Sequence, residues 1–152
     1  MAQNEAAKGA VEIRVFERFA QLRGLEIVAG SVQKRVPPEP DILCRIVSEG
    51  SLGFEITEAC APEFAAAESR ALREGVAFAW GGDVSVKTIR NKLAKCYSAP
   101  YPVELIVYAG RTALPDDVIV PTVKPVLANG TGPFRRVWFL GDELFELSAN
   151  EG

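Results

Sequence analysis

A chain of 152 residues, 48% hydrophobic and 24% charged, suffices for one globular domain with a core, so an intrinsically disordered protein is excluded. No apolar stretch approaches the ~20 residues of a membrane span, and the first ten residues lack the apolar run of a secretory signal, so the cytoplasm is the expected location. The absence of histidine excludes imidazole zinc sites, Ser-His and Cys-His nucleophile pairs, and histidine as general base.

The cysteines and the charge balance further reduce the number of possible functions. Cys44, Cys60 and Cys96 lie far apart among apolar neighbours and without a CxxC spacing, so reduced thiols in or near the core are expected. The formal net charge is −3. A protein that holds phosphates by charge alone is usually basic, so this balance argues against strong non-specific binding of nucleic acid. It still allows an acidic metal site beside a small local patch of arginines.

The N-terminal part is predicted to contain a helix, a strand and a connector. Residues 1–10 are small and polar and are expected to be disordered. Residues 11–23 have apolar side chains at helical spacing, and Gly24 ends the pattern. Residues 25–32 are a short apolar segment, which we expect to be the first strand. Residues 34–40 contain three prolines, which predicts an extended connector.

The next two strands are predicted to form a hairpin that carries acidic residues. Residues 41–47 and 52–58 are strand-like, and residues 48–50 between them give a turn signal. Asp41 opens the first strand, and Glu55 lies in the middle of the second. An acid inside an otherwise apolar strand is costly to bury without a partner, which favours a functional role for Glu55.

The register of this hairpin decides whether the two carboxylates meet. A turn centred near Glu49 would place Asp41 opposite Thr57 and diagonal to Glu55, roughly 7 Å away between backbones. At that separation two carboxylates can share a metal ion. A turn centred on Ser51 would move Asp41 out of reach. Side chains alternate along a strand, so Glu55 and Thr57 share one face of the sheet.

The middle of the chain is predicted to form helices that lead into an internal strand. Residues 62–74 are strongly helical, residues 80–83 form a loop, and residues 84–97 form a second helix. Residues 103–109 are nearly all apolar and β-rich, so an internal strand is expected. A strand, helices and a strand in this order indicate a crossover unit, usually right-handed.

The C-terminal part completes an α/β domain. Residues 115–129 are interrupted by two prolines and predict a short irregular helix. Residues 134–140 and 143–147 predict a terminal hairpin with a tight turn. The whole pattern indicates a single α/β domain over residues 11–152, with a mixed central β-sheet flanked by helices.

One combination of residues resembles a known family. Pro40-Asp41 is followed fourteen residues after the aspartate by Glu55-Ile56-Thr57, and this resembles the active-site motif of the PD-(D/E)XK nuclease superfamily, which has the restriction-endonuclease-like fold. The likeness covers roughly residues 11–110 and includes the order of the elements. The sequence departs from the motif at Thr57, where the family has a lysine. In some relatives a helix supplies that lysine instead.

The resemblance implies roles for specific residues. Asp41 and Glu55 would bind Mg²⁺ or Mn²⁺, and the backbone carbonyl of Ile56 would complete the shell. Such a metal polarises the scissile phosphate and lowers the pKa of its bound water. A helix-borne lysine would then stabilise the negative charge that builds on the phosphate or orient the water.

Two lysines of the second predicted helix are candidates for that role. On a helical wheel Lys92 lies at the edge of the apolar face formed by Ile89, Leu93 and Tyr97, whereas Lys95 points mostly away. A lysine at such a boundary can bury its stem and extend its ammonium over the sheet. We therefore favour Lys92, with Lys95 second. The alternative for both is a solvated charge on the helix surface.

Three further residues are weaker candidates. Thr57 can donate one hydrogen bond but carries no charge. Glu17, on the first predicted helix, is a further acid near the site if the resemblance holds, and otherwise a solvated charge. Glu58 would point to the opposite face of a regular strand.

The resemblance implies a metal-dependent nuclease that hydrolyses phosphodiester bonds in nucleic acid, with DNA favoured over RNA. The main alternative is a nuclease-like domain without activity, a binding or assembly module that could form a homodimer through the hairpin of residues 134–147. The missing motif lysine and the acidic balance favour this alternative. A third hypothesis is a metal-dependent hydrolase of another class that uses the same acids.

Overall fold

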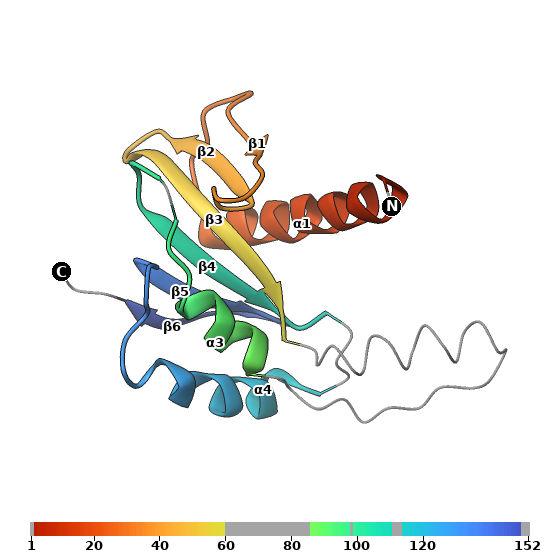
Figure 1. The fold of residues 1–152 in the computed structure, drawn as a ribbon. Coiled ribbons are helices and arrows are strands. Elements are labelled where there is room, and N and C mark those ends of the chain that lie inside the picture. Colours follow the sequence, from red (N-terminus) through yellow and green to blue (C-terminus); the bar gives the residue numbers. More distant parts are fainter. Residues whose placement is uncertain (1, 60–85, 98, 111–113, 150–152) are drawn as a thin grey trace, which may run out of the picture.

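The computed structural model describes residues 2–59, 86–97, 99–110 and 114–149, and Figure 1 shows their arrangement. The predicted helix at residues 62–74, the predicted loop at residues 80–83 and Cys60 lie outside these ranges. In the described part of the chain, no helix has the length and apolar character needed to cross a membrane.

A mixed sheet forms the centre of the fold, as the sequence predicted. Among the described residues it has six strands, which lie side by side in chain order. β3, β4 and β5 are parallel, and the other neighbouring pairs are antiparallel. The strands are β1 (Gln33–Lys34), β2 (Ile42–Ile46), β3 (Gly50–Glu58), β4 (Val103–Tyr108), β5 (Arg136–Leu140) and β6 (Leu144–Ala149).

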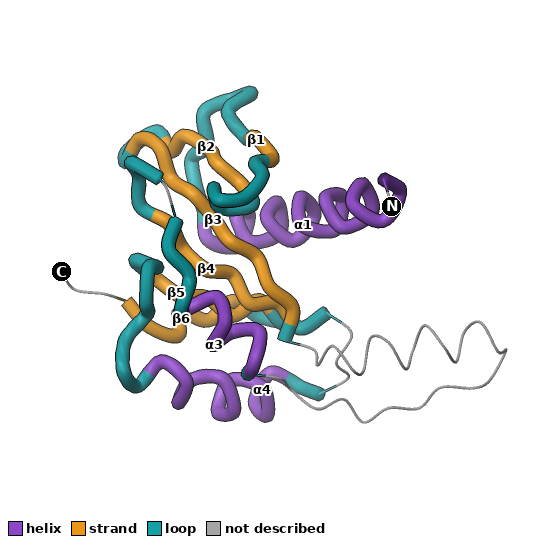
Figure 2. Tube along the Cα trace, viewed as in Figure 1, coloured by secondary structure: helices purple, strands orange, loops and turns teal. Residues whose placement is uncertain are grey.

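Helices cover both faces of this sheet (Figure 2). They are α1 (Ala2–Arg23), α3 (Lys87–Leu93), α4 (Asp116–Val123) and the 3₁₀ helix η1 (Lys124–Leu127). Phe54 of β3 packs with Phe16 and Phe19 of α1, with ring centroids 5.1 and 5.4 Å apart. On the other face, Leu105 of β4 belongs to a second buried cluster that includes Ile89 of α3. The alternation of side chains along each strand therefore supplies two separate cores.

Helix α1 is longer than the sequence pattern indicated. It begins at Ala2, so residues 2–10 are helical rather than disordered. The physical reason is local, because alanine, glutamine, glutamate and lysine, which are common in this stretch, are good helix formers. The helix ends where expected, since Gly24 has φ +71° and the amide of Leu25 donates to the Ala20 carbonyl.

The predicted first strand at residues 25–32 is wrong. This segment is a loop that forms one isolated bridge, between Ile27 and Ile46, because the turn at Gly30, with φ +75°, interrupts the pairing with β2. The strand that does pair with β2 is β1, which is only two residues long and lies at the start of the proline-rich connector.

The β2–β3 hairpin is confirmed, but its register differs from the expected one. Ile42 pairs with Phe54 and Ile46 with Gly50, so the turn is centred on Ser48 rather than Glu49. Gly50 allows this tight turn because its φ is +84°. One step beyond Ile42, the same register places Asp41 opposite Glu55 instead of Thr57.

The remaining predicted elements are largely confirmed. β3 and β4 are parallel, as a crossover requires, and β5 and β6 form the terminal hairpin. Helix α4 contains Pro121, and η1 follows it. Helix α3 differs, because it ends at Leu93 and does not continue to Tyr97. The loop before β5 limits it, since a Cβ on Gly132 would lie 2.2 Å from the Leu93 carbonyl oxygen.

Candidate active site

Asp41 and Glu55 lie side by side where β2 begins. The backbone amide of Asp41 donates to Glu55 Oε1 at 3.2 Å, and the amide of Ile56 donates to Asp41 Oδ2 at 3.0 Å. Each carboxylate thus binds the backbone of the other strand at the point where the regular ladder ends. The structure brings the two acids together more directly than the expected diagonal arrangement.

The backbone of Ile56 faces this pair. A strand residue directs its N–H and its C=O to the same neighbour, and the N–H of Ile56 points to Asp41. The carbonyl oxygen of Ile56 therefore lies on the same side of β3 as Asp41. This direction is the one that a backbone ligand beside the two carboxylates requires.

The second oxygen of Glu55 is surrounded by hydrogen-bond donors from the region of α3. Lys92 Nζ lies 3.3 Å and Lys95 Nζ 3.9 Å from Glu55 Oε2, and the Tyr97 hydroxyl donates to the same oxygen. Glu55 is only 3% exposed, so these partners compensate a buried charge. Two acids and two lysines therefore form one compact charged group.

The position of Lys95 differs from the helical-wheel expectation. Because α3 ends at Leu93, the chain turns after it, and the amide of Lys95 donates to the Lys92 carbonyl. This turn brings Lys95 back to Glu55 instead of pointing it away. Tyr97, which the sequence placed in an apolar stripe, meets Glu55 for the same reason, while its ring packs on Phe134 at 5.6 Å. In the sequence, only the hydroxyl at the end of its aromatic ring indicated that Tyr97 could reach a polar partner.

The environment shifts the acid–base properties of this group. Burial and the neighbouring Asp41 carboxylate raise the pKa of Glu55 above 4.5, although the Tyr97 hydroxyl and Lys92 act in the opposite direction. Burial, followed by repulsion from Lys92, lowers the pKa of Lys95. Burial and the hydrogen bond to Glu55 raise the pKa of Tyr97. The hydroxyl of Tyr97 therefore stays protonated and donates to Glu55.

Other acids on α1 lie outside the charged group. Glu17 is exposed on the helix surface. Glu12, which the sequence analysis did not select, is 5% exposed and binds Lys34 Nζ at 2.9 Å through Oε1. The sequence could have indicated this burial, because Glu12 precedes Phe16 and Phe19 by four and seven residues, and this spacing places it on the buried face of α1.

A cleft of about 920 Å³ opens beside the charged group, between the N-terminal half of α1 and the α3 region. Ile56, Thr57 and Glu58 of β3 line it, and so do Lys92 and Lys95. Thr57, the residue at the position of the motif lysine, is buried and contributes a hydroxyl to this wall. The two lysines thus connect the buried Glu55 to a space large enough for a ligand.

A second buried acid lies on the neighbouring strand and was missed because β4 reads as apolar. Glu104 accepts hydrogen bonds from Trp138 Nε1 at 2.7 Å and from Arg135 Nη2 at 2.6 Å. Arg135 also binds Glu49 at 3.1 Å. Burial, and then Glu104, raises the pKa of Cys44 to about 11, so this thiol stays protonated. Each charged side chain of this network has a partner, so we interpret the network as stabilising the fold.

The carboxylate oxygens of Asp41 and Glu55 are ligand atoms of the kind that bind a hard divalent cation. Two carboxylates and one backbone carbonyl are the oxygen ligands that Mg²⁺ prefers, and the mutual repulsion of the acids is what a cation relieves. Across the described ranges, no group of three or more acidic or thiol side chains is placed to hold a metal. A metal here would therefore depend on this pair, the Ile56 carbonyl and water.

Comparison with protein-family models, curated proteins and solved structures gave no match to this chain. The function is therefore argued from the arrangement of these side chains.

Proposed function

We propose that this chain is a metal-dependent nuclease that hydrolyses phosphodiester bonds, with DNA favoured over RNA. The observation that carries the proposal is the contact between Asp41 and Glu55 at the start of β2, with Lys92 paired to Glu55. An acidic hairpin, a helix and a parallel strand follow one another as the resemblance to the restriction-endonuclease-like fold implies.

The residues divide the work between binding and charge stabilisation. Asp41, Glu55 and the Ile56 carbonyl would hold Mg²⁺ or Mn²⁺, which supplies a polarised phosphate and a water of lowered pKa. Lys92 and Lys95 line the cleft, and their ammonium groups would stabilise the negative charge that develops on a phosphate bound there. Lys92 therefore takes the role of the motif lysine, because Thr57 occupies the position at which the family has that lysine.

Tyr97 positions Glu55 rather than reacting. Its hydroxyl fixes one carboxylate oxygen, and its ring is held against Phe134. The orientation of Glu55 is thereby set before any ligand arrives, which is the kind of preorganisation that electrostatic catalysis needs.

A specific observation favours a second function, an inactive nuclease-like domain that binds or assembles. Lys92, Lys95 and Tyr97 already neutralise and hold Glu55, so the charged group is complete as a structural ion-pair network. Among the residues that the structure describes, β6 is also an edge strand of the sheet, and such edges are surfaces for pairing with another chain. In this function the hairpin of β5 and β6 would form a homodimer.

Calorimetric titration of Mg²⁺ and Mn²⁺ separates the two functions. We expect the wild type to bind either ion and the Asp41→Asn/Glu55→Gln variant, which keeps the side-chain shapes, to lose binding. Folding of the variant is checked by its thermal unfolding. A wild type that binds neither ion at millimolar concentration, alone or with an oligonucleotide, would favour the inactive domain.

A cleavage assay on single-stranded DNA, duplex DNA and RNA tests the chemistry. Lys92→Ala should lower the cleavage rate by roughly 10²–10³-fold and leave metal binding in place. Lys87→Ala is the matched control, because Lys87 is an exposed lysine on the same helix. Equal rates for the two variants would remove Lys92 from the proposed mechanism.

A further inference from the structure

The cleft beside the charged group continues into a second hollow. That hollow, of about 580 Å³, lies between α1 and the turn that joins β5 to β6. Tyr108 and Gly110, at the C-terminal end of β4, line both spaces. Together the two form an edge groove that passes the C-terminal ends of the parallel strands beneath α1. In open α/β sheets this edge is the usual place for ligands.

Basic side chains lie on both sides of the edge groove. Lys8, Arg14 and Arg18 line it from α1, and Lys92 and Lys95 line it from the α3 region. Lys8 and Arg14 are exposed. Lys92 and Lys95 meet at Glu55, whereas Lys8, Arg14 and Arg18 follow one another along α1, which suits a ligand with repeated negative charges.

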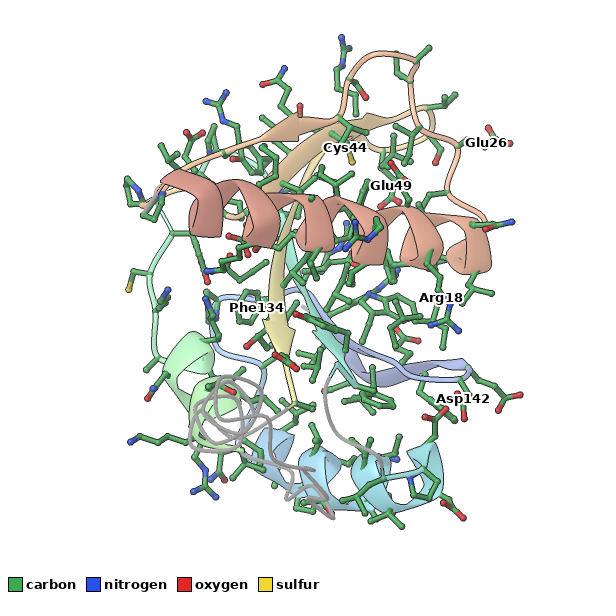
Figure 3. The ribbon with its side chains drawn as sticks, turned by 90° about the vertical axis from the view of Figure 1, so that its right-hand side faces the viewer. Arg18, Glu26, Cys44, Glu49, Phe134 and Asp142 are labelled. Carbon is green, nitrogen blue, oxygen red and sulfur yellow. The ribbon has the colours of Figure 1, made fainter. Side chains whose placement is uncertain are left out.

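Four acids also line the groove, namely Glu12, Glu58, Asp116 and Asp142. The carboxylates of two of them have partners that reduce their effect on an anionic ligand. Glu12 is paired with Lys34. Asp116 accepts hydrogen bonds from the backbone amides of Asp142 and Glu143. Arg18 donates to the carbonyls of Gly141 and Asp142 at 2.7 and 3.1 Å, and Figure 3 shows it above that turn. Arg18 therefore also ties α1 to the turn between β5 and β6.

An aromatic side chain stands where the two hollows meet. Tyr108 is partly exposed and lines both hollows. Thr57, Thr88 and Asn91 add neutral hydrogen-bonding groups to the wall. Cations that follow a backbone, combined with a ring on which a base can stack, are the features of sites for single-stranded nucleic acid.

We propose that the edge groove binds a single strand of nucleic acid. Its phosphates lie against Lys8 and Arg14 on one side and Lys92 and Lys95 on the other, and a base stacks on Tyr108. A single strand is favoured over a duplex because only an unpaired base can stack on the ring of Tyr108. The inference rests on the proposed function only in placing the reacting phosphate at Lys92.

Fluorescence anisotropy with a labelled single-stranded DNA in EDTA tests this binding without cleavage. At about 0.1 M salt, Lys8→Ala/Arg14→Ala should weaken binding by roughly tenfold or more and reduce the salt slope by about 1.4, since each phosphate contact on a single strand contributes about 0.7. The matched control is Arg45→Ala/Lys124→Ala, which removes two exposed cations outside the groove and should change neither quantity.

Further binding measurements distinguish a single strand from other ligands and test the role of Tyr108. A duplex of the same sequence and a polyglutamate peptide should bind more weakly than the single strand. Tyr108→Leu should weaken single-strand binding while Tyr108→Phe preserves it, with thermal unfolding as the check on folding. Preference for duplex or peptide, equal losses in the two double variants, or no binding in EDTA would each overturn the inference.

The two proposals fail in different ways. Single-strand binding that depends on Lys8 and Arg14, without cleavage in Mg²⁺ or Mn²⁺, would retain the edge groove and reject the nuclease. Cleavage that is indifferent to Lys8→Ala/Arg14→Ala would retain the nuclease and reject the groove.

Discussion

At the scale of single residues, Glu55 is a buried carboxylate whose two oxygens have different partners. Oε1 accepts from the backbone of Asp41, and Oε2 accepts from Tyr97 and Lys92. A buried carboxylate is tolerated because each of its two oxygens accepts at least one hydrogen bond. Removing one donor at a time therefore measures how the site is held together.

The hydroxyl of Tyr97 should contribute measurably to stability. Tyr97→Phe keeps the ring on Phe134 but removes the hydrogen bond to Glu55, so we expect the free energy of unfolding to fall by about 1 to 2 kcal/mol in urea denaturation. Tyr101→Phe is the control, because the buried Tyr101 hydroxyl has no hydrogen-bond partner in the part of the chain described. That change should cost nothing or stabilise slightly. Equal losses would contradict the assignment.

The raised pKa of Glu55 should appear in the pH dependence of stability. The folded protein keeps the Glu55 proton at pH values where the unfolded chain has lost it. Its contribution to stability is thus complete below 4.5 and is lost as the pH rises through the raised pKa. Urea unfolding of wild type and Glu55→Gln across this range measures it, because glutamine does not titrate. We expect the wild type to lose stability relative to the variant as pH rises, and a gain would contradict the assignment.

At the scale of elements, the end of α3 decides which side chains reach the site. The helix stops at Leu93, so Lys95 and Tyr97 reach Glu55 from a turn rather than from a helix face. The close approach of Gly132 to the Leu93 carbonyl holds this helix end against the loop before β5.

A side chain at Gly132 should disturb this contact. Gly132→Ala places a Cβ 2.2 Å from a carbonyl oxygen, and backbone must move to admit it, so we expect unfolding to become easier by about 3 kcal/mol or more. Gly24→Ala is a matched control, because Gly24 also has a positive φ but nothing lies within 4 Å of its added Cβ. It should cost only about 1 to 2 kcal/mol. Chemical denaturation of both variants tests the difference, and equal costs would rule out the contact.

At the scale of the whole molecule, a partly buried ion-pair network connects three strands of the sheet. Glu104 of β4 binds Arg135 and Trp138, and Arg135 reaches Glu49 in the β2–β3 turn. The network therefore ties the hairpin that carries Asp41 and Glu55 to β4 and β5.

Loss of the Glu104 charge should weaken the whole fold. Glu104→Gln leaves Arg135 without its buried partner, and we expect a loss of about 2 kcal/mol, moderated because Arg135 is partly exposed. Glu146→Gln removes the partner of Arg136 in an exposed pair and should cost less than about 0.5 kcal/mol. Thermal unfolding of the two variants provides the comparison. A similar small loss in both would show that the network carries little stability.

The sequence by itself determined most of the described strands and the faces of β3. The alternation in β3 separated Phe54 and Ile56, which joined the core under α1, from Glu55 on the other face, because neighbouring side chains of a strand always point oppositely. It also predicted the mixed sheet, the crossover and the terminal hairpin. These features follow from local periodicity and from the prolines and glycines that interrupt it.

Only the tertiary structure decided how those faces meet. The turn at Ser48, and not Glu49, placed Asp41 opposite Glu55, and a one-residue difference of this kind is below what a turn pattern resolves. The end of α3 at Leu93 brought Lys95 and Tyr97 to the same carboxylate. Contacts between residues forty positions apart depend on packing of whole elements, and no local spacing in the chain encodes them.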